Sequence, residues 1–275
     1  MSSVIAVVFG LLGALIGSFL NVVIYRVPAN KSIVSPPSAC GSCGARIRPW
    51  DNIPIVSWLV LRGRCRDCGA HISARYPAVE LGTALFFAGV AWWVAATATL
   101  PLTTPDLLAL ILMAVALLYL ASISVALALI DLDTHTLPNA IVLPAYLVGG
   151  VLLAASALLA GEPGRLLSAG IGGGGLFGLY LVLALVRPGG MGLGDVKLAG
   201  VLGLFLGWLG WGALFVGAFG AFLLGGVFGT ILMLFGKAGR KSSIPFGPWM
   251  LMGAWVGIFA GDQLATSYLG LFGLA

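Results

Sequence analysis

Long apolar runs dominate this sequence and limit what it can fold into. A helix needs roughly 20 consecutive apolar residues to cross a bilayer. The segments that meet or approach this length are 4–25, 79–100, 105–130, 138–160, 166–186, 198–208, 211–235 and 247–268. Only 8% of the residues are charged, against about 25% in an average soluble domain. The sequence therefore predicts an all-α polytopic membrane protein with about eight transmembrane helices. It excludes a soluble enzyme, a disordered chain and a nucleic-acid binder.

The basic residues mark one side of the predicted membrane protein. If the N-terminus lies outside, alternate connections between spans hold 13 of the 14 lysines and arginines, and only Arg165 falls elsewhere. These connections are 26–78, 131–137, 187–197 and 236–246. Because cytoplasmic loops carry an excess of Lys and Arg, we expect these segments to be cytoplasmic and both termini to lie outside.

The segment 26–78 is the one long hydrophilic stretch, and it contains all four cysteines. Cys40 and Cys43 form one C-x2-C pair, and Cys65 and Cys68 form a second pair 21 residues later. Two such pairs can supply four thiolates to a tetrahedral structural zinc site with no open position. Two disulfides are the alternative, but the predicted cytoplasmic location is reducing. We therefore favour zinc.

The acidic residues are few enough to be considered one by one. Asp51 and Asp67 lie in the hydrophilic segment and are expected to pair with neighbouring arginines. Glu80 lies just inside the second span, where an unpaired carboxylate is costly. It should pair with an arginine of that segment or line a polar cavity. The acidic residues at the predicted cytoplasmic ends of spans are Asp131, Asp133 and Asp195.

Two motifs carry these last carboxylates. The first is the segment 131–139, which joins the third and fourth spans. A helix that continues through Asp133 would project Asp131 and Asp133 about 200° apart, so only one of them could face the bundle interior. The second is a G-x-G-D sequence made by Gly192, Gly194 and Asp195. Taken alone, Asp195 could simply cap the following helix.

Convergence of two carboxyl groups would give them a chemical function. Like charges a few ångströms apart push the two pKa values apart, so that one group stays ionised and the other protonated. The ionised group can activate water, and the protonated group can donate to a scissile carbonyl. This pattern is typical of aspartic proteases.

At these residues the chain resembles the type 4 prepilin peptidases, a family of membrane aspartic proteases of the G-x-G-D type. Lys197 follows the G-x-G-D sequence, and Asp131 precedes Pro138 by seven residues. Further matching segments are 17–26, 50–54, 57–58, 62–63, 75–80 and 245–248, together with the four cysteines. The resemblance covers most of the chain, from near residue 10 to near residue 250.

The resemblance implies that Asp131 and Asp195 are the catalytic pair, with Asp133 the less favoured alternative for the first position. The supporting positions are Gly192, Gly194, Lys197, Asp133 and Glu80. It also implies that the substrates are type IV prepilins or pseudopilins, cut at the cytoplasmic face of the bacterial inner membrane. Members with this cysteine-bearing loop also N-methylate the new N-terminus with S-adenosylmethionine, but no residue is assigned to that cofactor.

The expected organisation is a first transmembrane helix (1–25), a cytoplasmic four-cysteine domain (26–78) and a membrane peptidase domain with seven helices (79–275). Small residues four apart, at Gly203 and Gly207 and at Gly225 and Gly229, predict close helix packing. A G-x-G-x-x-G match at 170–175 lies inside an apolar span with no strand before it. We interpret it as helix packing rather than as a nucleotide site.

Two other functions are compatible with parts of the sequence. Intramembrane carboxylates often mark ion pathways, so a proton or ion transporter is one alternative. However, the ionisable residues cluster on one side rather than across the membrane depth. A membrane-anchored zinc module that recruits a partner is the other alternative, but it leaves both aspartate motifs without a role.

Overall fold

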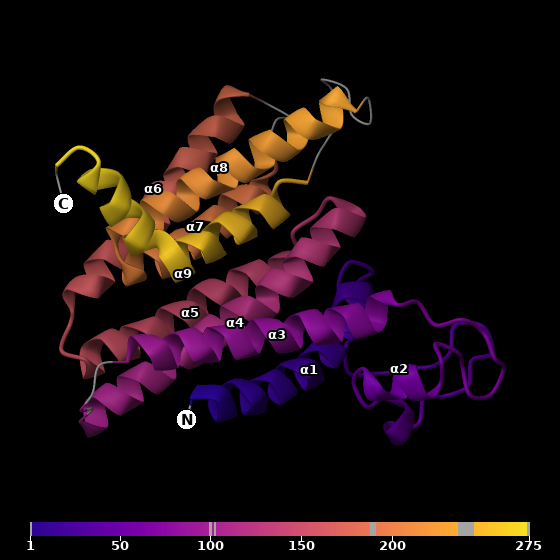
Figure 1. Cartoon of the computed structure of the whole chain (residues 1–275). Coiled ribbons are helices and arrows are strands. Elements are labelled where there is room, and N and C mark those ends of the chain that lie inside the picture. The colour runs from indigo at the N-terminus through magenta and orange to yellow at the C-terminus, as the bar shows by residue number, and fades with distance from the viewer. Residues whose placement is uncertain (1, 99–100, 102, 188–190, 236–244, 274–275) are drawn as a thin grey trace. The chain divides into compact units, whose positions relative to one another are not determined.

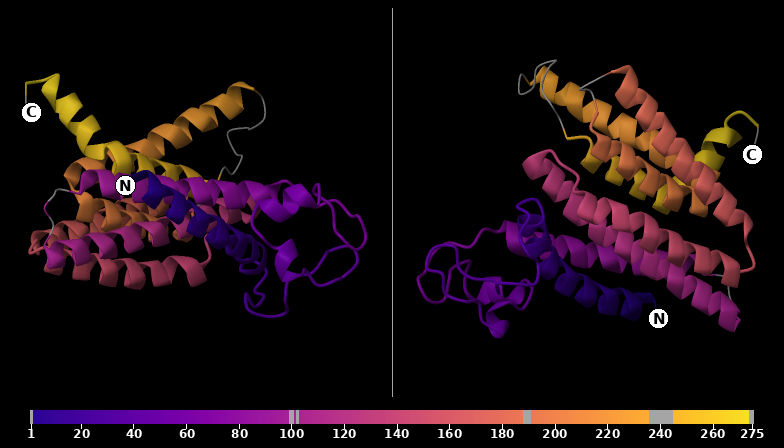
Figure 2. Two further views of the ribbon diagram at one scale, coloured as in Figure 1. Left: turned by 60° about the horizontal axis from the view of Figure 1, so that its bottom comes forward. Right: turned by 180° about the vertical axis from the view of Figure 1, so that it is seen from behind.

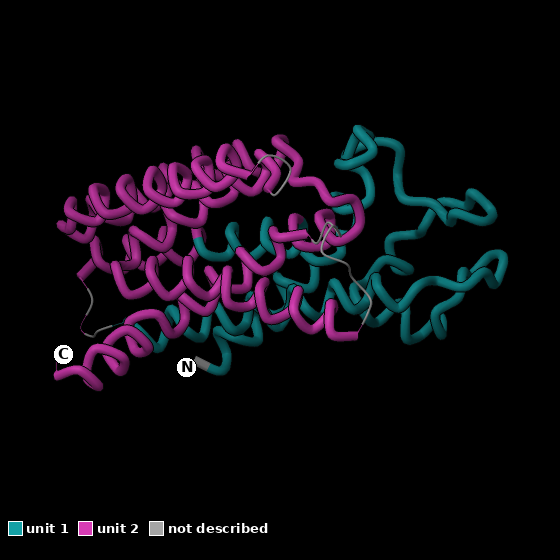
Figure 3. The backbone as a smooth tube through the Cα atoms, turned by 90° about the horizontal axis from the view of Figure 1, so that it is seen from above, with its two compact units in different colours: residues 1–100, 117–126 teal, residues 101–116, 127–275 magenta. Residues whose placement is uncertain are grey.

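The computed structural model describes residues 2–98, 101, 103–187, 191–235 and 245–273 (Figure 1). Lys237, Arg240 and Lys241, which contribute to the predicted orientation, lie outside the described residues. The chain forms two compact units (Figure 3). Unit 1 comprises Met1–Leu100 and Leu117–Ala126, and unit 2 comprises Pro101–Ala116 and Leu127–Ala275.

The described residues form helices and no strand, which confirms the predicted all-α class. The helices are α1 (Ser2–Arg26), α2 (Val56–Val60), α3 (Arg75–Thr97), α4 (Thr104–Thr134), α5 (Asn139–Leu159), α6 (Gly164–Val186), α7 (Leu193–Leu209), α8 (Trp211–Leu234) and α9 (Gly247–Gly270), with a 3-10 turn η1 (Pro49–Asp51). Six of them, α1, α3, α4, α5, α6 and α8, are long and apolar enough to cross a membrane. The chain is therefore a multi-pass membrane protein.

The two helices that carry the aspartate motifs extend further than their apolar runs predict. α4 continues four residues past residue 130 to Thr134, and His135 after it adopts a left-handed conformation with φ 52°. α7 begins at Leu193, although the apolar run starts only at residue 198. In both cases a segment that contains polar residues continues the helix, because the backbone hydrogen-bond pattern does not depend on side-chain polarity. These extensions place both aspartate motifs on helices.

In unit 1, α1 and α3 lie side by side, and the cysteine-bearing segment extends from the ends they share (Figures 1 and 2). Small residues allow the close approach. A Cβ on Gly13 would lie 2.7 Å from the carbonyl oxygen of Thr83, and one on Gly17 would lie 2.8 Å from the Cα of Glu80. The side-chain amide of Asn21 donates to the Tyr76 carbonyl at 3.2 Å and joins the same two helices.

In unit 2, glycines also form the contact between α6 and α7. A Cβ on Gly203 would lie 2.2 Å from the carbonyl oxygen of Gly172, and one on Gly207 would lie 2.4 Å from that of Ser168. The predicted packing role is confirmed for Gly203, Gly207, Gly172 and Gly173, whereas a Cβ on Gly170, Gly174 or Gly175 would meet nothing within 4 Å. Gly225 instead accommodates an aromatic ring, because a Cβ there would lie 2.7 Å from Cε2 of Phe246.

We expect Gly172→Ala to destabilise the protein, because the added methyl group would meet backbone atoms of α7. Its Cβ would lie 2.4 Å from the Gly203 carbonyl oxygen. Overpacking of this kind typically costs about 1–3 kcal/mol. Gly174→Ala is the matched control, since it lies on the same helix and its Cβ would meet nothing within 4 Å. Thermal unfolding in detergent should show a lower midpoint for the first variant only. Equal midpoints would contradict the tight α6–α7 contact.

Candidate active site and metal centre

Asp131 lies one turn from the end of α4 and is only 4% exposed. Its Oδ2 accepts the backbone N–H of Gly247, the first residue of α9, at 3.0 Å. A Cβ on Gly247 would lie 2.7 Å from this oxygen, so the close approach requires glycine. Asp133 is on the same helix but exposed. The helix thus separates the two aspartates as the 3.6-residue repeat requires, and Asp131 is the one that faces inward.

Asp195 is the third residue of α7, and the G-x-G-D sequence forms the start of that helix. Its Oδ2 accepts the backbone N–H of Gly192 at 3.1 Å, so the Asp195 side chain caps the first turn of α7. Gly192 is the N-cap residue, and because it has no side chain it cannot accept the reciprocal hydrogen bond of a full capping box. Gly194 faces the turn between α4 and α5, where an added Cβ would lie 3.0 Å from Cβ of Leu137.

The two aspartates belong to one cluster within unit 2. Asp131 is among the ionisable groups near Asp195. Leu137 lies between the residues that hold the two aspartates. A Cβ on Gly194, which precedes Asp195, or on Gly247, whose N–H binds Asp131, would lie within 3.3 Å of the Leu137 side chain. Asp195 lies at the N-terminus of its own helix α7, and the Asp131 side chain, which projects from the last turn of α4, contacts the N-terminus of α9. A helix N-terminus favours negative charge. The cluster therefore combines two carboxyl groups with backbone donors that fix their orientation.

α5 holds α7 in position through two hydrogen bonds. Lys197 Nζ donates to Oδ1 of Asn139 at 3.0 Å. The hydroxyl of Tyr146 donates to the Lys197 carbonyl at 2.6 Å. Lys197 therefore links the first turns of α5 and α7, which is a positioning contact for the neighbouring Asp195.

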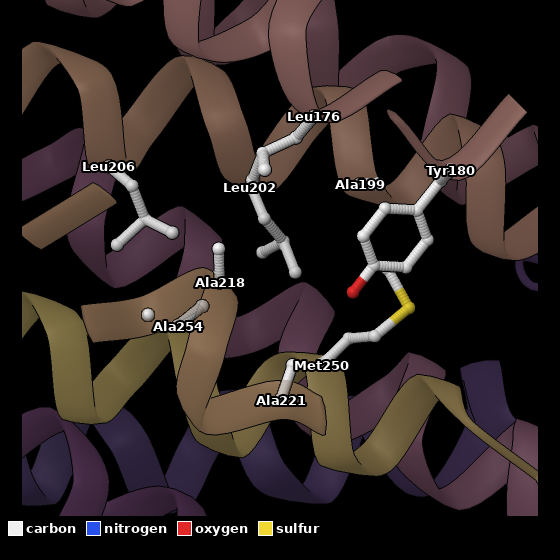
Figure 4. Close-up of a pocket in the computed structure, with 10 residues that line it drawn as sticks. Leu176, Tyr180, Ala199, Leu202, Leu206, Ala218, Ala221, Met250 and Ala254 are labelled. Atoms are coloured by element: carbon white, nitrogen blue, oxygen red, sulfur yellow. The ribbon is translucent and has the colours of Figure 1, made fainter. Parts of the chain in front are cut away.

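Tyr180 of α6 is the residue near this cluster that the sequence pattern did not single out. It is almost fully buried, and Asp195 acts on it electrostatically. Its ring packs against Phe222 and Phe246, with centroids 5.4 and 6.3 Å away. Beside Met250 it lines a small, mainly apolar cavity of about 10 Å³ (Figure 4). A tyrosine inside an apolar span is its only sequence signal, and that signal does not distinguish it from a core residue.

The four cysteines form a second cluster, in unit 1. Their sulfur atoms all lie within 4.8 Å of one another, and Sγ of Cys40 is 3.8 Å from Sγ of Cys68. All four are free thiols. Tetrahedral zinc with bonds of about 2.3 Å would place its sulfur ligands roughly 3.8 Å apart. A disulfide would bring two sulfurs to about 2.05 Å. The donor set and spacing therefore fit a four-thiolate metal site.

Both cysteine pairs adopt the same turn. The N–H of Gly44 donates to the Cys40 carbonyl at 2.9 Å, and the N–H of Gly69 donates to the Cys65 carbonyl at 2.9 Å. Both glycines have φ near +70°, which disfavours any residue with a Cβ. Backbone N–H groups of Cys43 and then Ser42 lower the pKa of the Cys40 thiol to about 6. In the first turn the backbone thus favours the Cys40 thiolate, the form that binds metal. In the second pair the bond from the Ala70 backbone is outweighed by hydrogen bonds to the other thiols and by burial, which raise the pKa of Cys68 to about 12.

Comparison with known proteins identifies the chain. Residues 11–94 match the Bacterial Peptidase A24 N-terminal domain, and residues 118–234 match the Type IV leader peptidase family. The chain belongs to the type IV leader peptidase family. The N-terminal match covers the four-cysteine cluster, and the second match covers both aspartates of the leader peptidase.

Relatives of this leader peptidase cover nearly its whole length. A prepilin leader peptidase/N-methyltransferase from Stutzerimonas stutzeri is 35% identical over 287 residues, which is 94% of this chain and 91% of the relative. Proteins of the same name from Pseudomonas aeruginosa and Neisseria gonorrhoeae are 36% and 33% identical, and the alignments cover 94% and 92% of this chain and 91% and 90% of the relatives. No solved structure gives a significant match.

Three further acidic residues of the leader peptidase have clear partners. Asp51 forms a bidentate pair with Arg66, and Asp67 pairs with Arg48 at 3.0 Å, which confirms the predicted ion pairs. The Arg66 guanidinium holds the pKa of Asp51 below its ordinary value. Glu80 is buried, and its Oε2 accepts the backbone N–H of Ile55 at 2.7 Å. Its partner is thus a backbone group rather than the arginine or polar cavity that the sequence led us to expect.

We expect Gly247→Ala to slow catalysis in this leader peptidase without unfolding it. The new Cβ would displace Asp131, and a misplacement of about 1 Å can lower a rate roughly 10²-fold. The measurement is the turnover number and Michaelis constant for a prepilin peptide, with the effect confined to turnover. Gly226→Ala in α8 is the control, because its Cβ would meet nothing within 4 Å. An unchanged turnover number would show that Gly247 does not position Asp131.

Proposed function

We propose that this protein is a membrane aspartic endopeptidase that removes the leader of type IV prepilins or pseudopilins. The observation that carries this proposal is the clustering of two carboxyl groups from separate helices, Asp131 and Asp195, each fixed by a backbone N–H. The names of the relatives support prepilins as the substrate class.

In the proposed reaction one aspartate is ionised and the other is protonated. The ionised carboxylate takes a proton from water, and the water oxygen attacks the scissile carbonyl. The protonated carboxyl donates its proton to the carbonyl oxygen. As the tetrahedral intermediate collapses, the aspartate that took the proton from water gives it to the leaving nitrogen, and the other aspartate takes a proton back from a hydroxyl of the intermediate. The C–N bond breaks, the carbonyl re-forms as a carboxyl group, and both aspartates return to their starting protonation states. In each aspartate Oδ2 accepts a backbone N–H, which leaves Oδ1 for water or substrate.

We also propose that the protein methylates the new N-terminal amine, as the names of its relatives indicate for them. S-adenosylmethionine would supply the methyl group. Zinc at Cys40, Cys43, Cys65 and Cys68 would have a structural role, because four thiolates complete its coordination and leave no position for water or substrate.

The proposed location is a bacterial inner membrane, with both termini outside and the active site at the cytoplasmic face. The excess of lysine and arginine in alternate connections supports this orientation. Both aspartates are close to such connections. The leader of a substrate would then reach the aspartates from the cytoplasm, where water is available.

Mass spectrometry of one reaction tests both activities. The purified protein is incubated with a prepilin and S-adenosylmethionine, and the product mass is compared with that of the intact substrate. We expect loss of the leader together with the mass of one added methyl group. Cleavage without methylation would contradict the second activity only. An intact substrate with folded enzyme would contradict the peptidase.

A further inference from the structure

The short helix α2 carries an apolar face that is open to the surroundings. Trp50, Ile53, Val56, Leu59 and Val60 have exposed fractions of 61%, 49%, 53%, 60% and 69%, and we call them the α2 patch. The last three are spaced i, i+3 and i+4, so they share one side of the helix. This is an unusual surface for the one long hydrophilic segment of the chain.

The opposite side of α2 is held by specific contacts. The hydroxyl of Ser57 donates to the Trp50 carbonyl at 2.9 Å and accepts the N–H of Ile53 at 3.0 Å. The indole of Trp58 donates to the Ile72 carbonyl at 3.0 Å. These bonds fix which side of the helix is outward, so the exposure of the patch is a stable property of unit 1.

A single hydrogen bond sets the depth of α2 relative to the membrane helices. Ile55, which precedes α2, donates its N–H to Glu80, five residues into α3. That position is about 7.5 Å along the helix from its start, at 1.5 Å per residue. The headgroup region on each side of a bilayer is roughly 5–8 Å thick. α2 therefore lies beside the part of α3 that passes through the membrane surface.

Aromatic residues mark the same level. Tyr25 near the end of α1 and Tyr76 near the start of α3 are both exposed. Tyrosine and tryptophan are enriched where a protein crosses the membrane–water interface. Trp50 of the α2 patch extends this set of aromatic residues onto the hydrophilic segment.

Basic residues accompany the patch. Arg62 and Arg64 directly follow α2, are exposed, and have no carboxylate partner among the described residues. Arg48 and Arg66, in contrast, are neutralised by Asp67 and Asp51. An apolar helix face beside unpaired arginines is the combination that binds an anionic lipid surface.

We propose that α2 is an interfacial helix that docks the four-cysteine segment onto the lipid surface. The α2 patch enters the boundary between headgroups and acyl chains, and Arg62 and Arg64 bind the phosphates of anionic lipids. A bilayer is the occupant favoured by the depth of α2 and by the basic surplus. This inference is independent of the peptidase activity, because it depends only on unit 1.

Photocrosslinking of the full-length protein in lipid nanodiscs tests the proposal. Benzoylphenylalanine replaces Leu59 or, separately, Val60, and Ser42 at the exposed turn of the first cysteine pair is the control position. The nanodiscs contain phosphatidylcholine alone or with phosphatidylglycerol. Mass spectrometry should find lipid adducts several-fold more often at positions 59 and 60 than at 42, and more often with phosphatidylglycerol. Arg62→Gln with Arg64→Gln should remove the phosphatidylglycerol effect.

Three results would overturn the proposal. Lipid adducts at positions 59 and 60 could be no more frequent than at position 42. The yield could be independent of phosphatidylglycerol. Finally, an added prepilin peptide could capture the crosslinks in place of lipid, which would make the α2 patch a peptide-binding surface.

Discussion

Asp131→Asn or Asp195→Asn is expected to abolish leader cleavage while leaving the fold intact. An asparagine side-chain oxygen can still accept the N–H of Gly247 or Gly192, so the substitution removes the ionisable group and little else. Loss of general acid–base catalysis lowers rates by about 10²–10⁴-fold. Because each aspartate has a different proton to transfer, we expect either substitution alone to be sufficient. Single-turnover cleavage of a prepilin peptide measures the effect.

Two other aspartates provide the comparison. Asp262 lies in α9, beside the turn into α8, where a Cβ on Gly212 would lie 2.4 Å from its Oδ1. Because Asp262 contacts this turn and not the cluster of Asp131 and Asp195, Asp262→Asn should retain activity. Asp133→Asn distinguishes the two candidates in the first motif, and we expect it to remain active because Asp133 faces away from Asp131 along the helix. If Asp195→Asn cleaved at the normal rate in folded protein, the two-aspartate mechanism would be wrong.

Replacing a single metal ligand is expected to unfold the cysteine-bearing segment. Cys65→Ser removes one of the four thiolates, and a structural zinc site contributes about 10–16 kcal/mol to the folding of zinc-finger peptides at pH 7. Elemental analysis of the full-length protein should show about one zinc per chain, falling to a small fraction in the variant. Limited proteolysis with trypsin should then cut rapidly within the segment, at arginines such as Arg62 and Arg64.

Ser42→Ala is the control for this variant, because Ser42 lies in the same turn as Cys40 and Cys43 but contributes no thiolate. It should keep its zinc and its resistance to trypsin. Chelation of the unsubstituted protein should reproduce the effect of Cys65→Ser, and it should impair methylation more directly than cleavage. Absence of zinc from reduced, protease-resistant protein would contradict the four-thiolate site.

Sequence reasoning succeeded where the determining interactions are local. The length of an apolar run predicts a membrane helix, and a helix is present at each of the eight runs among the described residues, six of them long and apolar enough to cross a membrane. The spacing of Cys40 and Cys43, and of Cys65 and Cys68, indicates two metal-binding turns. The hydrogen bonds that form each turn lie within a few residues of the cysteines. Glycine spacing similarly predicted close helix packing at Gly203 and Gly207, although it did not indicate that α6 is the partner of α7.

The helix ends were harder to predict because polar residues extend α4 and α7 beyond the apolar runs. This extension determined the geometry of the first motif. A periodicity argument showed that Asp131 and Asp133 must point apart, but it could not say which one faces inward. The answer depends on α9, whose first residue is 116 positions away from Asp131. The resemblance included the segment 245–248 at the start of that helix, but nothing in the sequence indicated that Gly247 contacts Asp131.

The sequence by itself determined the class of protein, the four-thiolate cluster and the two candidate aspartates, because apolar length, C-x2-C spacing and the G-x-G-D motif act over short distances along the chain. Only the tertiary structure showed that the Gly247 N–H orients Asp131, that Tyr180 lies near Asp195, and that Glu80 holds α2 at the start of α3. These contacts join residues that are far apart in sequence. They exist only after glycine-lined helix faces have packed closely enough for backbone groups and side chains to meet.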